Sequence, residues 1–197
     1  MTLQGIVLAS ASPRRRELLA QVGLTTEVVP ADVDETVRPG ETPENHVVRL
    51  SEAKALAVAR RPEVTGRWFI GSDTVVVRDS RILGKPTGPE DAAAMLRSLS
   101  GRSHEVVSGY AVHDHKNGRM LSGAVVTRVW FKPLTEQEIA GYLATGEPFD
   151  KAGAYAIQGL GAFMVPRIDG SYPNVVGLPL CEVIAALETC GAVNLFP

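Results

Sequence analysis

The stretch that decides the fold is Val7-Leu8-Ala9-Ser10-Ala11-Ser12-Pro13-Arg14-Arg15-Arg16-Glu17-Leu18-Leu19, where a short apolar run turns directly into a helical pattern. Ser12 is a favourable N-cap residue, and Pro13 suits the first helical position, where its missing N–H costs no hydrogen bond. We therefore expect a strand over residues 5–9 and a helix over residues 12–22.

The first turn of this helix carries three arginines, although a helix N-terminus already bears roughly half a positive charge. Such a cluster is favourable when an anion lies among the cations. The hydroxyls of Ser10 and Ser12, the free backbone N–H groups and the guanidinium groups of Arg14 and Arg15 would together hold a phosphate. The alternative is a solvated basic turn.

The remaining chain alternates between strand and helix patterns without an internal repeat. The expected strands cover residues 25–30, 67–78, 104–113, 119–131 and 154–165, and the expected helices cover residues 43–61, 89–99, 135–144 and 178–190. Asn117-Gly118 between two strands is a hairpin signal. Crossover units together with a hairpin predict an α/β fold with a mixed sheet.

Composition limits the classes of function. The 197 residues suffice for one domain, 1–197, or for two closely joined lobes, and the net charge of −2 argues against binding long nucleic acid. No run approaches the roughly 18 apolar residues of a membrane helix, and Met1–Gln4 lacks the features of a signal peptide. Cys181 and Cys190 form no disulfide framework, so we expect reduced core thiols in a cytoplasmic protein.

Asp73 is the strongest single candidate for chemistry. It falls in a strand pattern on the same face as Phe69 and Val75, where a carboxylate is costly unless it is paired or binds a metal. The alternative is that Gly71-Ser72-Asp73 only bends the chain.

Further candidates lie in an acidic loop and on the following helix. Asp32, Asp34 and Glu35 are either solvated or supply a carboxylate to Mg²⁺ on a nucleotide. Lys54 is in helical register with Val47, Leu50 and Ala57, so it either runs along the helix edge or points from a buried face toward phosphate.

Two residues of the later chain complete the candidates. Lys85 lies in the tight loop Leu83-Gly84-Lys85-Pro86, which is not a Walker A loop because Asp79 stands where its first glycine would be. Gln158 carries a donor and an acceptor on one amide, which suits the edge of a pyrimidine base, although a strand glutamine is usually a surface residue. The four histidines lack zinc-ligand spacing, and His113 and His115 are expected to be exposed near the hairpin tip.

These pieces, in this order, resemble the motifs of the Maf family of nucleoside triphosphate pyrophosphatases, over nearly the whole chain. The matching segments are Ser10-Ala11-Ser12-Pro13-Arg14-Arg15, Asp34-Glu35-Thr36, Ser51-Glu52-Ala53-Lys54-Ala55, Ser72-Asp73-Thr74-Val75-Val76, Gly84-Lys85-Pro86 and Asp150-Lys151-Ala152-Gly153-Ala154-Tyr155-Ala156-Ile157-Gln158-Gly159.

The resemblance implies an elongated α/β fold with two lobes and a cleft between them, like that of the inosine triphosphate pyrophosphatases. It implies that Asp73 is a metal ligand and proton acceptor, with Glu35 as a second ligand. Arg14, Thr74 and Gln158 match the trio of the subgroup that acts on dTTP and UTP. A homodimer is implied by family analogy only.

The expected reaction releases pyrophosphate from a nucleoside triphosphate. Mg²⁺ or Mn²⁺ held by Asp73 and Glu35 would lower the pKa of a water that attacks the α-phosphorus, with Arg14, Lys54 and Lys85 among the groups that neutralise phosphate charge. Two alternatives stay open at this point. One is the same reaction on another base, such as 7-methyl-GTP or a damaged or modified pyrimidine nucleotide. The other is a nucleotide-binding regulator of septum formation or cell division that does not hydrolyse its ligand.

Overall fold

The computed structural model describes residues 5–196 and confirms the expected α/β class. Within these residues one seven-stranded mixed sheet has the order β2-β1-β3-β5-β6-β7, with β4 paired to β3. Strand β1 pairs in parallel with β2 and β3, whereas β4 and β7 pair antiparallel with β3 and β6. The strands are β1 (Ile6–Leu8), β2 (Glu27–Val28), β3 (Trp68–Arg78), β4 (Arg81–Leu83), β5 (Ser103–Asp114), β6 (Arg119–Trp130) and β7 (Arg167–Asp169).

The five helices that the sequence predicts appear in the same order in the structure, and α5 and the 3₁₀ segments are additional. The helices are α1 (Pro13–Gln21), α2 (Pro43–Ala59), α3 (Pro89–Leu99), α4 (Glu136–Ala144), α5 (Tyr172–Val176) and α6 (Leu180–Thr189), with three 3₁₀ segments, η1 (Glu147–Asp150), η2 (Ala152–Ala154) and η3 (Leu160–Met164). None of the helices within residues 5–196 is both long enough and apolar enough to cross a membrane. Met1–Gln4, on which the expected lack of a signal peptide rests, lie outside the described residues.

The chain divides into two compact units. Of the described residues, 5–73, 108–125 and 177–196 form the first unit, and 74–107 and 126–176 form the second. The long strands β3, β5 and β6 each contribute residues to both units.

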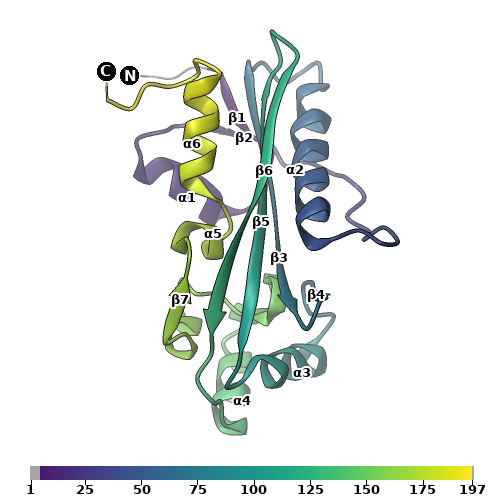
Figure 1. Ribbon diagram of the computed structural model, residues 1–197, viewed down its shortest axis with the longest axis vertical. Coiled ribbons are helices and arrows are strands. Elements are labelled where there is room, and N and C mark those ends of the chain that lie inside the picture. Colours follow the sequence, from purple (N-terminus) through teal and green to yellow (C-terminus); the bar gives the residue numbers. More distant parts are fainter. Residues whose placement is uncertain (1–4, 197) are drawn as a thin grey trace. The chain divides into compact units, whose positions relative to one another are not determined.

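In the first unit α2 packs on one face of the strands. Figure 1 shows α2 on one side of the strands, with α1 and α6 on the other. The buried cluster beneath α2 draws on β1, α2, β3 and β5, and comprises Val7, Ala9, Ala55, Val58, Ala59, Phe69 and Ala111. Burial of these apolar side chains supplies the main favourable free energy of this layer.

Two glycines let the backbone of α2 lie directly against the sheet. A Cβ added to Gly71 on β3 would lie 1.9 Å from the carbonyl oxygen of Ser51, and one added to Gly109 on β5 would lie 2.3 Å from that of Val47. Any side chain at either position would push the helix away. Lys54, which follows Ser51 on α2, is therefore held close to β3.

Local signals set the helix starts as expected. The hydroxyl of Thr42 accepts a hydrogen bond from the backbone N–H of Asn45 at 3.2 Å and caps α2. Thr135 and Glu138 form a reciprocal capping box at the start of α4. Ser12 stands at the N-cap position of α1 but makes no side-chain capping bond there.

The expected strand over residues 154–165 is wrong. This segment instead runs through η2 and η3, because Gly153, Ala154 and Gly159 have positive φ angles of 68°, 59° and 112° that a strand does not contain. The apolar run over 154–157 is buried all the same. Burial without alternation does not distinguish a strand from an irregular buried segment.

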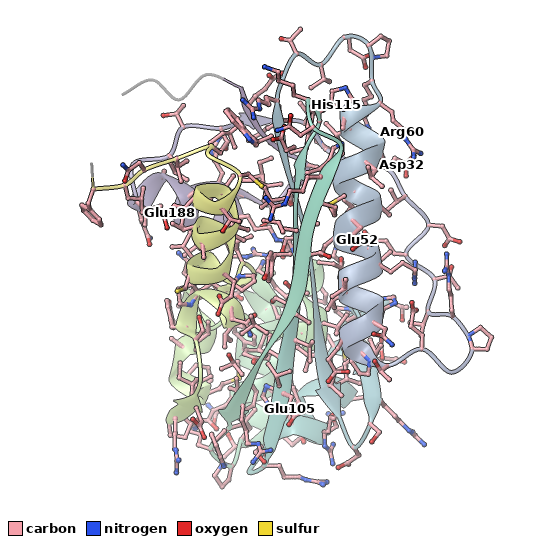
Figure 2. All side chains as sticks on the ribbon, turned by 45° about the horizontal axis from the view of Figure 1, so that its top comes forward. Asp32, Glu52, Arg60, Glu105, His115 and Glu188 are labelled. Carbon is pink, nitrogen blue, oxygen red and sulfur yellow. The ribbon has the colours of Figure 1, made fainter. Side chains whose placement is uncertain are left out.

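One alternative and two smaller expectations also need correction. The alternative that Gly71-Ser72-Asp73 only bends the chain is wrong, because β3 continues through this segment from Trp68 to Arg78. His113 is buried, whereas His115 at the turn between β5 and β6 is exposed (Figure 2). Cys181 is exposed and Cys190 is half-buried, so neither thiol lies in the core, although both are free.

Candidate functional site

Three charged side chains of the first unit meet at one point. The ammonium Nζ of Lys54 lies 2.7 Å from Asp73 Oδ1 and 2.6 Å from Glu35 Oε1. The side chains of Lys54 and Asp73 are only 10% and 11% exposed, whereas that of Glu35 is 56% exposed. Lys54 and Asp73 therefore form the buried part of the cluster, and Glu35 is accessible to solvent.

The close packing of α2 against β3 explains how Lys54 reaches Asp73. Asp73 lies two residues beyond Gly71 on β3, so its side chain is on the strand face that α2 covers. Lys54 belongs to the buried stripe of α2 together with Val47, Ser51 and Val58. The pairing with Asp73 meets the need of a buried carboxylate for a charged partner.

Ala57, which the sequence placed in the stripe of Lys54, is only half-buried. The stripe instead continues through Val58, which is fully buried. The buried stripe of α2 that contains Lys54 therefore continues through Val58 and not through Ala57.

The acidic loop runs alongside α2, with Asp32 exposed on it (Figure 2). Arg49 of α2 holds this loop. Its guanidinium donates to Glu41 through Nε at 2.5 Å and Nη2 at 2.8 Å, and Nη2 also donates to the carbonyl oxygen of Thr36 at 3.1 Å. Asp34 in turn accepts from the backbone N–H of Thr36 at 2.9 Å. These bonds fix the backbone on both sides of Glu35.

The hydrogen bonds from Arg49 lower the pKa of Glu41, so Glu41 stays ionised at neutral pH. The sequence reasoning missed both residues. Their sequence signal was weak, namely an acidic residue just before a helix N-cap and a basic residue two turns into the helix.

The turn before α1 contains a network around Arg15. Its Nη1 donates to Ser10 Oγ at 3.0 Å and to the carbonyl oxygen of Ser72 at 2.8 Å, and its Nε donates to that of Gly177 at 2.7 Å. Ser10 Oγ also accepts from the backbone N–H of Ser12 at 3.2 Å. Because Ser72 directly precedes Asp73 on β3, this network ties the start of α1 to the strand that carries Asp73.

The surroundings of Arg15 lower the pKa of its guanidinium. Burial lowers the pKa of its guanidinium, the carboxylate of Asp73 counteracts this, Arg14 lowers it further and Glu35 raises it. The electrostatic influence of these groups on Arg15 means that the basic turn and the carboxylates share one neighbourhood in the first unit. Arg14 itself is half-buried at the start of α1.

The other predicted site residues, Thr74, Lys85 and Gln158, belong to the second unit. Lys85 is exposed on its loop, and the neighbouring carbonyl oxygen of Gly84 accepts from the backbone N–H of Gly153 at 3.0 Å. The side-chain oxygen Oε1 of Gln158 is buried and has no hydrogen-bond partner within residues 5–196. A buried amide oxygen without a partner is unusual and suggests that a ligand group completes it.

The cluster is compatible with a divalent cation. Because Glu35 Oε1 and Asp73 Oδ1 lie 2.6 Å and 2.7 Å from the same Nζ, they are within about 5.3 Å of each other. No group of three or more His, Cys, Asp or Glu side chains gathers at one point in the described part of the chain. Mg²⁺ commonly takes one or two protein carboxylates and completes its shell with water and substrate phosphate oxygens, so two carboxylates fit it.

Comparisons with known proteins agree with the motifs. A dTTP/UTP pyrophosphatase of Syntrophotalea carbinolica is 66% identical over 192 residues, covering 98% of this chain and 87% of that protein. A dTTP/UTP pyrophosphatase of Geotalea uraniireducens is 58% identical over 189 residues, covering 96% of each chain. A solved HAM1 protein from Coxiella burnetii has a TM-score of 0.43 and 19% identity, covering 64% of this chain and 72% of its own, and at this level the likeness carries no argument.

The family model described as Maf-like protein matches residues 5–190, which include every site residue discussed above. This match and the identities to curated relatives confirm the resemblance seen in the motifs. The chain belongs to the Maf-like protein family.

Proposed function

We propose that this protein hydrolyses dTTP and UTP to the nucleoside monophosphate and pyrophosphate, and so removes these nucleotides from the pool. The names of its relatives support this activity. The observation that carries it is the convergence of Asp73 and Glu35 on Lys54, with the basic turn of α1 in the same unit. Carboxylates beside several cations form the kind of site that phosphoryl transfer needs.

In the proposed reaction a water oxygen forms a bond to the α-phosphorus. The bond from that phosphorus to the oxygen bridging to the β-phosphorus breaks, and pyrophosphate leaves with the electron pair. Lys54 donates to Asp73 Oδ1, and we assign Asp73 Oδ2 as the acceptor of the water's proton. Lys54 also orients this carboxylate, which fixes the direction from which the proton is taken.

We further propose that Asp73 and Glu35 hold a divalent cation, Mg²⁺ or Mn²⁺. Bound there, the cation would supply positive charge to the phosphate oxygens and make water more acidic. The exposed position of Glu35 and its distance of at most about 5.3 Å from Asp73 support this assignment.

Substrate binding is assigned to the start of α1 in the first unit. Ser10, Ser12 and Arg14 lie at or next to a helix N-terminus, where backbone N–H groups attract phosphate. Arg15 contributes charge while its hydrogen bonds to Ser72 and Gly177 hold the turn in place.

For the second unit, Lys85 stays a predicted phosphate contact and Thr74 a predicted selectivity residue. The buried Oε1 of Gln158, which lacks a protein partner within residues 5–196, supports its assignment to the edge of a pyrimidine base. We infer that residues 1–197 act as one domain, since one family model spans both units. A place in the cytoplasm stays a prediction from the sequence. The homodimer stays a prediction, to be tested by light scattering.

The experiment is a panel of triphosphates, namely dTTP, UTP, dCTP, GTP and 7-methyl-GTP, assayed for pyrophosphate with Mg²⁺ or Mn²⁺ and with a chelator. We expect dTTP and UTP to give the highest kcat/KM and the chelator to abolish turnover. Asp73→Asn should lower kcat about 100-fold or more, since it removes the proton acceptor but keeps an oxygen for Lys54.

Glu105→Gln is the matched control, because this residue lies on the neighbouring strand β5 (Figure 2) and forms a surface ion pair with Arg128 at 3.3 Å. It should retain wild-type turnover. Near-wild-type turnover by Asp73→Asn would refute the assigned role. Binding of triphosphate without hydrolysis, unaffected by chelator, would instead favour a regulatory module.

A further inference from the structure

The carboxylate of Glu147 in the second unit accepts hydrogen bonds from two backbone N–H groups and from a tyrosine hydroxyl. Its Oε2 accepts from the backbone N–H of Leu160 at 3.1 Å, and its Oε1 accepts from that of Gly161 at 3.0 Å. The hydroxyl of Tyr142 donates to Oε1 at 2.8 Å. A half-buried carboxylate thus meets three donors, two of which belong to the segment that follows Gln158.

Tyr142 extends this contact to the segment that precedes Gln158. Its hydroxyl oxygen accepts from the backbone N–H of Ala156 at 3.1 Å while its proton goes to Glu147. Tyr142 is almost fully buried on α4, so this hydroxyl has little freedom to turn elsewhere. We call Glu147 and Tyr142 the clamp, because their hydrogen bonds hold the chain on both sides of Gln158, at residue 156 and at residues 160 and 161.

The glycines of this segment fit closely around the same two side chains. Gly159 has a φ of +112°, and a Cβ added there would lie 2.7 Å from Glu147 Oε2. A Cβ added to Gly161 would lie 2.4 Å from the carbonyl oxygen of Ala156 and 2.7 Å from the Tyr142 hydroxyl. The path of the chain is thus set by contact with Glu147 and Tyr142 and leaves no room for side chains between them.

The protonation states suit this arrangement at neutral pH. Burial of Glu147 acts to raise its pKa, but the hydrogen bonds from Gly161, Tyr142 and Leu160, together with the charge of Lys151, outweigh it, and the net shift is downward. Burial raises the pKa of Tyr142, so its hydroxyl keeps the proton that it donates. Glu147 is therefore an acceptor and Tyr142 a donor throughout the pH range in which the enzyme would work.

We propose that Glu147 and Tyr142 are positioning residues that set base selectivity by fixing the segment that carries Gln158. This inference rests on the proposed function, in which the Gln158 amide reads the base. An amide that is free to move can match either thymine, with N3–H beside a carbonyl oxygen, or cytosine, with an N3 acceptor beside an amino group. Discrimination requires that the backbone beneath the amide be held, and residues 155–159 have no strand ladder to hold it.

The test compares Tyr142→Phe and Glu147→Gln with Glu136→Gln. The control residue lies on the same helix, α4, but forms a surface ion pair with Arg97 at 2.7 Å. For each protein we would measure kcat/KM with dTTP and with dCTP, the thermal midpoint, and amide hydrogen exchange at residues 156, 160 and 161. We expect both clamp variants to lower the dTTP/dCTP ratio about fivefold or more, since each loses at least one hydrogen bond of roughly 1 kcal/mol.

Exchange at the three amides should be faster in the clamp variants, and the control should match wild type in every measurement. An unchanged dTTP/dCTP ratio with faster exchange would overturn the proposal, because the segment would then be loosened without consequence for selectivity.

A double-mutant cycle with Gln158→Ala separates this role from a merely structural one. If the clamp acts through Gln158, Tyr142→Phe should change the dTTP/dCTP ratio in the wild-type background and leave it unchanged in the Gln158→Ala background. Equal changes in both backgrounds would overturn the proposal. If the wild-type protein hydrolyses none of the triphosphates, the proposed function falls and the selectivity role falls with it, while amide exchange still reports separately whether the clamp holds the segment.

Discussion

Replacing Gly71 by alanine tests the contact on which the geometry of the site depends. The new Cβ would lie 1.9 Å from the carbonyl oxygen of Ser51 and 2.9 Å from the backbone nitrogen of Ala55. Both atoms belong to the backbone of α2, so no flexible side chain can move aside. Because real Cβ contacts stay beyond 3.0 Å, α2 has to retreat from β3 by about 1 Å or more.

The retreat has two consequences of predictable size. Overpacking of this kind costs about 3 kcal/mol of unfolding free energy, which for a chain of this length lowers the thermal midpoint by about 6–12 °C. The Lys54 Nζ to Asp73 Oδ1 distance, now 2.7 Å, lengthens unless the lysine side chain rearranges. A displacement of about 1 Å at the site should lower kcat with dTTP at least tenfold.

Gly141→Ala is the matched control, because Gly141 lies exposed within α4 and a Cβ added there meets nothing within 4 Å. Alanine is favoured over glycine in a helix by about 1 kcal/mol, so the control should raise the midpoint by about 2–4 °C. The assay is thermal unfolding together with pyrophosphate release for both variants. A Gly71→Ala protein with the wild-type midpoint and turnover would refute the close packing of the α2 backbone against Gly71.

Two further predictions concern stability and the acidic loop. Burial lowers the pKa of His104 to about 4 from 6.5, so stability present above pH 6.5 should fall by about 3 kcal/mol as the pH drops to 4, because the unfolded chain takes up the proton first. Urea unfolding of His104→Phe at pH 7 and pH 4.5 should show a smaller difference than wild type, and an equal difference would contradict the assignment. Arg49→Gln breaks the paired hydrogen bonds to Glu41 and should lower kcat about tenfold by loosening the loop of Glu35, whereas unchanged kcat would argue against this support.

Much of the local structure follows from residues close together in the chain. Thr42 and Pro43 place the start of α2, and Thr135 with Glu138 places that of α4, because capping satisfies backbone N–H groups within one turn. Helix α3 begins and ends at the expected residues, Pro89 and Leu99. The motifs likewise sufficed to identify the family, since they recur in order along the chain.

The contacts that build the site were beyond such local signals. Alternation placed Asp73 on an apolar strand face, but only the packing of α2 on Gly71 shows that Lys54 is its partner. Residues 154–165 have the composition of a strand, yet they form 3₁₀ segments. Gly153 and Gly159 have positive φ angles, and Glu147 accepts a hydrogen bond from the backbone N–H of Leu160. Capping and periodicity depend on neighbours within a few residues, so the sequence alone determined the starts of α2, α3 and α4 and placed Asp73 on a buried strand face. Partners far apart in the chain depend on which surfaces pack together, and only the tertiary structure decided that.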